Sequence, residues 1–274
     1  MLKEMFENLR ASAPLVHSIT NYVTVNDCAN ILLACGASPI MADDEREAAE
    51  ITELCGALNI NIGTLNSRTI PAMFAAGERA AACGRPALLD PVGAGASKLR
   101  TDTALALMEK VPFTVIRGNI SEVRTLARGC GTTKGVDADA AERVSEDNLA
   151  ESAKFAKSFA RSAKAIIVMT GAIDIAADGE RAFAIRNGDP MMSRITGAGC
   201  MLSAMTAAYL AANRDNPLEA AVTSVCAMGL CGERAAARLG ANDGNSTFRN
   251  YLIDEIYNLD GETLERGARY EILR

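Results

Sequence analysis

The sequence predicts an α/β fold in which helices cover both faces of a mainly parallel central sheet. Two observations lead to this prediction. Short apolar runs alternate with longer Ala-rich stretches of helical character, which is typical of strands and helices that follow one another in a parallel sheet. No Pro- or Ser-rich linker, low-complexity tract or repeat interrupts the alternation. We therefore expect residues 1–274 to form a single domain.

In the first half of the chain, apolar runs bounded by turn residues predict strands, and the stretches between them predict helices. Gly36 is suited to end the second helix, since glycine is favoured just past a helix C-terminus. The strands expected here are Leu15–Ile19, Ser38–Met41, Ala57–Ile62 and Ala87–Leu89. The helices expected here cover residues 1–11, Asn26–Cys35, Asp44–Leu54, Ser67–Cys83 and 97–110.

The second half continues the pattern with one variation. Asp178-Gly179 is a strong turn dipeptide between two apolar runs, and it predicts a β-hairpin over Ile175–Asn187. The remaining strands are expected at Phe113–Ile116 and Lys164–Met169. The remaining helices are expected to start near Ile120, to cover 147–162, to follow Gly199, and to lie near 217–238 and 246–259.

Composition excludes several functional classes. Lys and Arg number 28 against 34 Asp and Glu, so the formal net charge is −6, and neither a nucleic-acid surface nor a polybasic membrane surface is expected. The single histidine, His17, cannot build a multi-histidine zinc site within one chain. The eight cysteines contain no C-x-x-C pair. Together with a charged N-terminus unlike a signal peptide, this predicts a cytoplasmic protein with free thiols and no membrane partner.

The segment Thr196-Gly197-Ala198-Gly199-Cys200 stands directly before an apolar helix. The free N–H groups and positive dipole end of a helix N-terminus suit a phosphate or a developing anion. Cys200 stands at that end, where a thiol pKa tends to fall. The alternative is a Gly-rich turn that packs the helix tightly on the sheet, with Cys200 as a small hydrophobic residue.

Two more polar segments follow predicted strands. Asp90 precedes a Gly-rich loop and could hold Mg²⁺ directly or through water, although Asp-Pro turns are common. In Arg117-Gly-Asn119-Ile-Ser-Glu122, Asn119 and Glu122 could face a Mg²⁺-phosphate while Arg117 contacts a nucleotide phosphate. The alternative for this pair is a helix-capping box, which has the same spacing.

Two further segments could line a small-molecule pocket. In the first, His17 to Asn26, polar groups are interleaved with β-branched residues. Its alternative is a turn with Asn26 as a helix cap, and a lone histidine such as His17 is more often structural than catalytic. The second, Val168 to Asp174, could meet a nucleotide or be a plain strand-to-turn junction.

Taken together, these segments resemble the hydroxyethylthiazole kinases of thiamine salvage, which belong to the ribokinase-like superfamily. The Gly-Ala-Gly-Cys segment is the most specific, because most ribokinase-like kinases carry Asp where Cys200 stands. The resemblance implies a ribokinase-like three-layer fold. The matching segments keep the family order from about residue 15 to residue 212 and read HSITNYVTVNDCAN, ASPIMADD, NINIGTL, LLDPVGAGAS, VIRGNISEV, KGVD, VMTGAID and ITGAGCMLSA.

The resemblance also implies a reaction, in which ATP phosphorylates the hydroxyl group of 4-methyl-5-(2-hydroxyethyl)thiazole with Mg²⁺ as cofactor. It implies a homotrimer whose thiazole sites lie at subunit boundaries. The residues implied to line the thiazole pocket are Asn21, Val23, Met41 and Gly197. The implied ATP contacts are Arg117 and Thr170, and the acidic residues associated with Mg²⁺ are Asp90 and Glu122.

The implied catalytic residues are Gly197, Gly199 and Cys200. Backbone N–H groups of this segment would form an anion hole for the transferred phosphoryl group. Cys200 would occupy the general-base position near the substrate hydroxyl. Because a thiolate and an alkoxide differ in proton affinity by many orders of magnitude, we expect the anion hole to contribute more than the thiol.

Three other functions stay open at this point. The first is a ribokinase-like kinase with another acceptor, such as a hydroxymethylpyrimidine. The second is a cysteine hydrolase or amidotransferase that pairs Cys200 with His17, which would need neither ATP nor Mg²⁺. The third is a regulator that binds the nucleotide or the thiazole without turnover.

Overall fold

The computed structural model describes residues 1–130 and 143–273. Within these ranges, nine strands form one sheet in the order β2-β1-β3-β4-β5-β6-β7-β8-β9. Neighbouring strands from β2 to β6 are parallel, and β7, β8 and β9 join antiparallel. The strands are β1 (Leu15–Ile19), β2 (Ser38–Ile40), β3 (Ala57–Asn61), β4 (Ala87–Asp90), β5 (Val115–Asn119), β6 (Ile166–Thr170), β7 (Asp174–Ala177), β8 (Ala182–Ile185) and β9 (Tyr270–Leu273).

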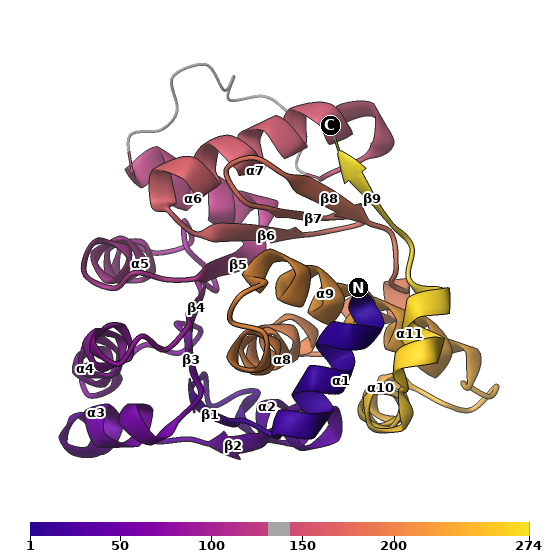
Figure 1. The fold of residues 1–274 in the computed structure, drawn as a ribbon, viewed down its shortest axis with the longest axis horizontal. Coiled ribbons are helices and arrows are strands. Elements are labelled where there is room, and N and C mark those ends of the chain that lie inside the picture. The colour runs from indigo at the N-terminus through magenta and orange to yellow at the C-terminus, as the bar shows by residue number, and fades with distance from the viewer. Residues whose placement is uncertain (131–142, 274) are drawn as a thin grey trace.

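Helices cover both faces of this sheet (Figure 1). On one face lie α3 (Glu45–Leu54), α4 (Thr69–Ala82), α5 (Lys98–Lys110), α6 (Ile120–Gly129) and α7 (Leu149–Ala163). The other face carries α1 (Leu2–Ser12), α2 (Val25–Cys35), α8 (Ala198–Ala212), α9 (Pro217–Ala237), α10 (Asn245–Asn258) and α11 (Gly261–Gly267). The short 3₁₀ helices are η1 (Glu146–Asn148) and η2 (Pro190–Arg194).

The core consists of two apolar clusters separated by the sheet. On β6, Ile166 and Val168 pack into the cluster under α8 and α9, whereas Ile167 and Met169 pack into the cluster under α4 to α7. Successive side chains of a strand point to opposite faces, so a strand buried on both faces must be apolar at nearly every position. The predicted mainly parallel sheet with helices on both faces is therefore confirmed.

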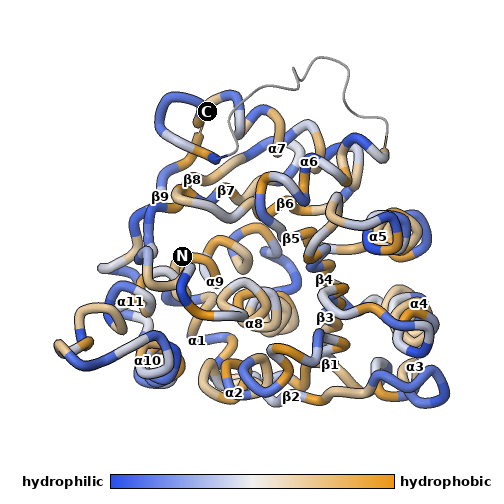
Figure 2. Tube along the Cα trace, turned by 180° about the vertical axis from the view of Figure 1, so that it is seen from behind, coloured by the Kyte–Doolittle hydropathy of each residue, from blue (hydrophilic) through white to orange (hydrophobic). Residues whose placement is uncertain are grey.

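Helix α8 lies in the interior and is buried on all sides, from Cys200 to Leu210. Figure 2 shows apolar colours along α9 and pale to apolar colours along α8, and hydrophilic colours along the outer helices α3 and α10. Within the described part of the chain, no helix combines the length and apolarity needed to cross a membrane.

Several element boundaries differ from the prediction for local reasons. Strand β6 starts at Ile166, because Lys164 takes a left-handed conformation (φ 51°) at the end of α7. Strand β5 covers Val115–Asn119, two residues further along the chain than predicted at its start. Helix α2 begins at Val25 with Thr24 at its N-cap, so the alternative of Asn26 as the cap is wrong. The hairpin is confirmed by β7 and β8, which pair antiparallel on either side of Asp178.

Candidate active site

Polar side chains gather where the central parallel strands end. Asp90 ends β4, Asn119 ends β5 and Thr170 ends β6. The strand register places Asn61 beside Asp90 and Asn119 beside Thr170. Because ligands of open α/β sheets bind beyond the carboxyl ends of the strands, this edge of the sheet is the candidate active site.

The N-terminus of α8 points into the same region. Gly197 is the N-cap with φ +88°, a left-handed conformation that favours glycine. The first helical bond is donated by Met201 to the carbonyl of Gly197. The N–H groups of the first helical turn, starting at Ala198, therefore have no acceptor within the helix, which is the arrangement of an anion site.

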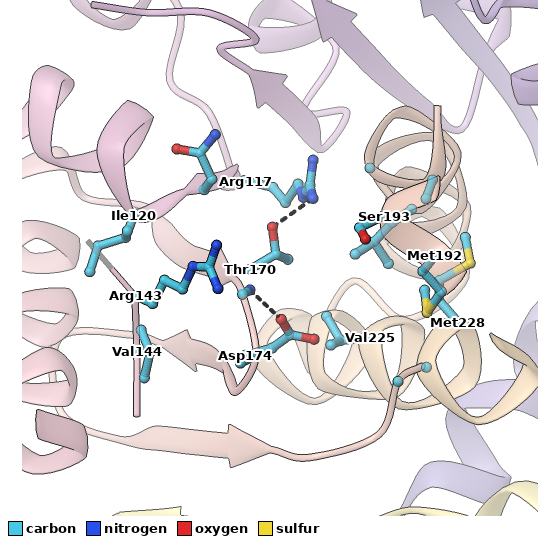
Figure 3. A pocket seen from close by; sticks show the side chains of 18 of the residues that line it. Arg117, Ile120, Arg143, Val144, Thr170, Asp174, Met192, Ser193, Val225 and Met228 are labelled. Atoms are coloured by element: carbon cyan, nitrogen blue, oxygen red, sulfur yellow. Dashed lines mark hydrogen bonds between the residues drawn. The ribbon is translucent and has the colours of Figure 1, made fainter. Parts of the chain in front are cut away.

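Arg117 lies directly against this helix end. A Cβ added to Gly199 would stand only 2.5 Å from Nη1 of Arg117, so no side chain fits between the guanidinium and the helix. Arg117 Nη2 donates to Oγ1 of Thr170 over 2.6 Å (Figure 3). The two residues implied to bind ATP thus form one unit beside the predicted anion hole.

Asp90 lies next to Arg117 and is fully buried. Its Oδ2 accepts hydrogen bonds from Asn61 Nδ2 (2.7 Å) and Ser203 Oγ (2.8 Å), whereas its Oδ1 has no hydrogen-bond partner and stands 3.8 Å from Arg117 Nη1. Burial raises the pKa of this carboxyl to about 6, and the charge of Arg117 opposes the rise. One oxygen of Asp90 is thus an unused acceptor next to a cation.

Glu122 forms the capping box that was the alternative to a metal role. Its Oε2 accepts from the backbone N–H of Asn119 (2.8 Å), and Asn119 Oδ1 accepts from the N–H of Glu122 (2.9 Å). Glu122 Oε1 also accepts from the N–H of Gly93 over 2.8 Å. This carboxylate therefore ties the Gly-rich loop after β4 to the start of α6, at the same carboxyl edge of the sheet as Asp90.

Cys200 is buried between two side-chain amides. Asn21 Nδ2 and Asn61 Nδ2 both donate to its Sγ over 3.2 Å. Burial raises the pKa of the thiol, and the nearby Asp90 raises it further. The expectation that the helix end lowers this pKa is therefore wrong, because desolvation outweighs the helix dipole.

Asn61 is a site residue that the sequence interpretation missed. Its Nδ2 donates to both Asp90 and Cys200, and its Oδ1 accepts from Asn21 Nδ2 (3.1 Å) and from the N–H of Gly63 (2.9 Å). The signal in the sequence is two asparagines within an otherwise apolar strand. That alternation predicts a strand but does not by itself mark Asn61 as a site residue, and Asn61 is 1% exposed.

His17 takes no part in this cluster. Its Nδ1 is 2.8 Å from Thr52 Oγ1 and its Nε2 is 2.8 Å from the carbonyl oxygen of Ala42. With both ring nitrogens bonded to these groups, His17 does not pair with Cys200. The alternative of a cysteine hydrolase with a Cys-His pair is therefore wrong, and the structural interpretation of His17 is confirmed.

The residues implied to bind the thiazole have different environments. Asn21 is buried against Cys200, and its Oδ1 accepts from the N–H and the hydroxyl of Thr24. Met41 is half-buried and packs against the apolar cluster that contains Cys200. Val23 is 58% exposed and lies at the surface beside the exposed Tyr22.

A cavity of about 1090 Å³ opens on the other side of Arg117. Thr170, Gly171 and Gly199 line it, and three arginines that the sequence interpretation missed, Arg124, Arg128 and Arg143, line it as well. Arg124 and Arg128 are four residues apart on α6, so they share one face of the helix. The KGVD segment, residues 134–137, lies outside the described residues.

Asp174 also faces this cavity (Figure 3). Its Oδ1 accepts from the N–H of Gly171 over 2.8 Å, which fixes the turn between β6 and β7. Burial raises the pKa of Asp174 to about 7. Among residues 1–130 and 143–273, no group of three or more His, Cys, Asp or Glu side chains is placed to hold a metal ion by itself.

A helix N-terminus that faces an arginine-lined cavity, at the carboxyl edge of a mainly parallel sheet, defines a phosphotransferase site in a three-layer α/β fold. A ribokinase-like superfamily protein of Enterococcus faecalis shares this fold, with a TM-score of 0.62 at 13% identity over 93% of this chain and 89% of the other. The chain thus has the ribokinase-like fold.

The particular family follows from closer comparisons. The model of the hydroxyethylthiazole kinase family matches residues 6–262. A hydroxyethylthiazole kinase of Clostridium acetobutylicum is 63% identical over 271 residues, which is 99% of each chain. The structure of a hydroxyethylthiazole kinase protein of Pyrococcus horikoshii superposes with a TM-score of 0.89 at 35% identity, and the match covers 100% of this chain and 99% of the other. The chain belongs to the hydroxyethylthiazole kinase family.

Proposed function

We propose that this protein transfers the γ-phosphoryl group of ATP to the hydroxyl group of 4-methyl-5-(2-hydroxyethyl)thiazole. Membership of the hydroxyethylthiazole kinase family supports this proposal. The single observation that carries it is the contact between Arg117 and Gly199, which brings a fixed cation to the open N–H groups of α8. A triphosphate in the cavity and an alcohol near Gly197 would meet at that point.

The positive charge that lines the cavity suits the negatively charged phosphates of ATP. Four arginines, Arg117, Arg124, Arg128 and Arg143, line it together with the Thr170–Gly171 turn. Arginine forks and backbone N–H groups are the usual partners of phosphate oxygens. The cavity also exposes apolar groups of Leu202, Val225 and Met228, against which a flat base can pack.

The thiazole alcohol fits the opposite side of Gly199. Asn21 and Met41 come from the β1–α2 and β2–α3 connections, and Asn21 contacts Cys200 at the start of α8. Gly197 leaves no room for a side chain beside Thr24, since an added Cβ would be 2.7 Å from Cγ2 of Thr24. This close packing fixes the end of α8 beside Thr24 and supports an approach of the substrate hydroxyl to that end.

A Mg²⁺ ion suits the two acidic residues only if it takes most of its ligands from phosphate and water, as Mg²⁺ commonly does. Asp90 Oδ1 is a buried acceptor with no hydrogen-bond partner, and each oxygen of Glu122 uses one acceptor position for a backbone N–H. These residues therefore fit a Mg²⁺ that is shared with the nucleotide. When bound, the ion would neutralise charge on the phosphate oxygens.

In the proposed mechanism the protein mainly positions the two substrates and neutralises the charge of the phosphate groups. Arg117 contacts a phosphate with its guanidinium group, while the hydrogen bond from its Nη2 to Thr170 fixes the orientation of that group. The N–H groups after Gly197 donate hydrogen bonds to the negatively charged oxygens of the transferred phosphoryl group, which moves in line to the hydroxyl oxygen. Cys200 stays a thiol near neutral pH because burial raises its pKa, so it orients the hydroxyl and contributes little as a base.

The proposal extends to the assembly and setting that the family resemblance implies. We propose a homotrimer with thiazole sites at subunit boundaries, in which residues 1–274 act as one kinase domain in the cytoplasm. The exposed Tyr22 and Val23, next to the buried Asn21, support a boundary at this place. Mass photometry or ultracentrifugation tests the trimer directly.

The function is tested by a coupled ADP-release assay with Mg-ATP and the thiazole alcohol, with a hydroxymethylpyrimidine and no acceptor as controls. Thiazole-dependent ADP release supports the proposal. ADP release with the pyrimidine but not with the thiazole would support a kinase activity and contradict the thiazole as the acceptor. Thiazole binding in calorimetry without any release would favour a binding regulator.

A further inference from the structure

The chain's single histidine holds the segment that carries Met41. Strands β1 and β2 pair in parallel, and their last pair is His17 with Ile40. The next residues, Met41 and Ala42, lie beyond that pair and before α3 begins at Glu45. His17 reaches across this gap, since its Nε2 is 2.8 Å from the carbonyl oxygen of Ala42.

The direction of the hydrogen bonds follows from the partners. A carbonyl oxygen can only accept, so Nε2 carries a proton and donates to Ala42. Burial lowers the pKa of His17, so the ring is neutral near pH 7 and Nδ1 has a lone pair. Thr52 Oγ1, 2.8 Å from Nδ1, then donates to the ring, and it shares its proton with the carbonyl of Ala48, also at 2.8 Å.

The segment that His17 holds has few other restraints from the sheet. Strand β2 has only three residues and lies at the edge of the sheet. Its middle residue, Pro39, has no N–H to donate. His17 itself is 0% exposed, so its ring is fixed by the core and gives Ala42 a rigid anchor.

We propose that His17 is a positioning residue for the acceptor substrate, which fixes the Met41–Ala42 segment through the Ala42 carbonyl and so sets the shape of the thiazole pocket. This inference rests on the proposed function, because it takes Met41 as a contact of the thiazole. It assigns His17 no contact with substrate and no part in proton transfer.

Two substitutions separate the two ring nitrogens. In His17→Gln, the side-chain amide reaches the position of Nε2 and can still donate to Ala42, while the bond to Thr52 is lost. In His17→Asn, the shorter amide reaches the position of Nδ1 and can bond Thr52, while the carbonyl of Ala42 is left without its donor. Both variants remove the ring from the same buried site.

We expect the KM for the thiazole in His17→Asn to be about tenfold higher than in His17→Gln, since an unsatisfied buried carbonyl disfavours the binding-competent segment. The KM for ATP should be the same in both. Thr52→Val, which removes the partner of Nδ1 and the bond to Ala48 but leaves the bond from Nε2 to Ala42, should leave the thiazole KM near that of the unmodified protein. Equal thiazole KM values in His17→Asn and His17→Gln would overturn the inference. Absence of thiazole-dependent ADP release in the unmodified protein would instead reject the proposed function.

A second measurement does not depend on the variants folding. Because His17 is the only histidine, its ring nitrogens give one unambiguous pair of signals in a long-range ¹H–¹⁵N NMR spectrum. We expect the tautomer with the proton on Nε2, and a shift of the Nε2 signal when the thiazole is added but not when a nucleotide is added. A spectrum that responds equally to both ligands, or to neither, would contradict the inference.

Discussion

Gly197→Ala is the substitution that most directly tests the placement of the anion hole. Gly197 caps α8 with φ +88°. An alanine there adds a single methyl group. That methyl would lie 2.7 Å from Cγ2 and 3.1 Å from Cβ of Thr24.

Two costs follow, and they differ in kind. A non-glycine residue in the left-handed region costs about 1–2 kcal/mol of stability. In addition, the new methyl and Thr24 must separate by about 0.7 Å to reach ordinary contact at 3.4 Å. Since α8 is packed on all sides, the helix end has to move, and a misplacement approaching 1 Å can lower activity by about a hundredfold.

Gly84→Ala is a matched control for the first cost. Gly84 also has a positive φ, +60°, but an added Cβ would meet nothing within 4 Å. It lies after α4, away from the site. Gly197→Ala should therefore lose at least as much stability as Gly84→Ala in urea unfolding, whereas Gly197→Ala alone should lose about a hundredfold in kcat/KM in the ADP-release assay. Adding Thr24→Ser, which removes Cγ2, should recover part of that loss.

The reasoning is refuted if Gly197→Ala keeps the kcat/KM of Gly84→Ala. In that case the N-terminus of α8 either tolerates the displacement or does not receive the transferred phosphoryl group. A loss that the Thr24→Ser change leaves untouched would place the cause in the backbone conformation of Gly197 and not in the contact with Thr24.

Three other predictions concern the charged and thiol groups. Arg117→Gln should raise the KM for ATP by about ten- to a hundredfold, since bonds to charged groups contribute about 1.5–3 kcal/mol, and an unchanged KM for ATP would contradict the assignment. Burial raises the pKa of Asp174 to about 7, so this group stabilises the fold below its unperturbed pKa and that contribution is lost as the pH rises through about 7. Between about pH 4 and about pH 8, the free energy of urea unfolding should fall less in Asp174→Asn than in the unmodified protein. Parallel pH curves for the two proteins would disprove this. The kcat of Cys200→Ser should fall by less than the factor of about a hundred that is expected when a general base is removed. A larger fall in kcat would show that the thiol acts as the general base.

Much of the fold could be predicted because its strands are buried on both faces. Leu15–Ile19 was predicted with the bounds that it has, since a short, mainly apolar segment between turn residues leaves little freedom. Strand β9 and helix α11 were not predicted. β9 pairs antiparallel with β8, a partner almost ninety positions earlier in the chain, and its exposed Glu271 gives no strand pattern by itself.

The site could be predicted where a residue type points to one role, such as glycine at a helix end or arginine beside a phosphate. Gly199, Arg117 and Thr170 lie together at the predicted place. The buried network around Asn61 was not predicted, because the partners of an amide depend on which strands become neighbours. The lowered thiol pKa expected for Cys200 failed for a related reason: helix ends can be located in a sequence, but the degree of burial that outweighs the dipole cannot.

The position of α8 in the chain has a consequence for synthesis on the ribosome. Val16, Ala57 and Leu88 contribute to the same apolar cluster as α8, yet they are made more than a hundred residues before it. At a translation rate of about 5–20 residues per second, that face of the nascent sheet waits on the order of ten seconds for its cover. A chain that stops before α8 would expose this face and attract chaperones or other nascent chains. The same late helix carries Cys200 and is capped by Gly197, so this face of the sheet is covered and the phosphate site is created in the same step.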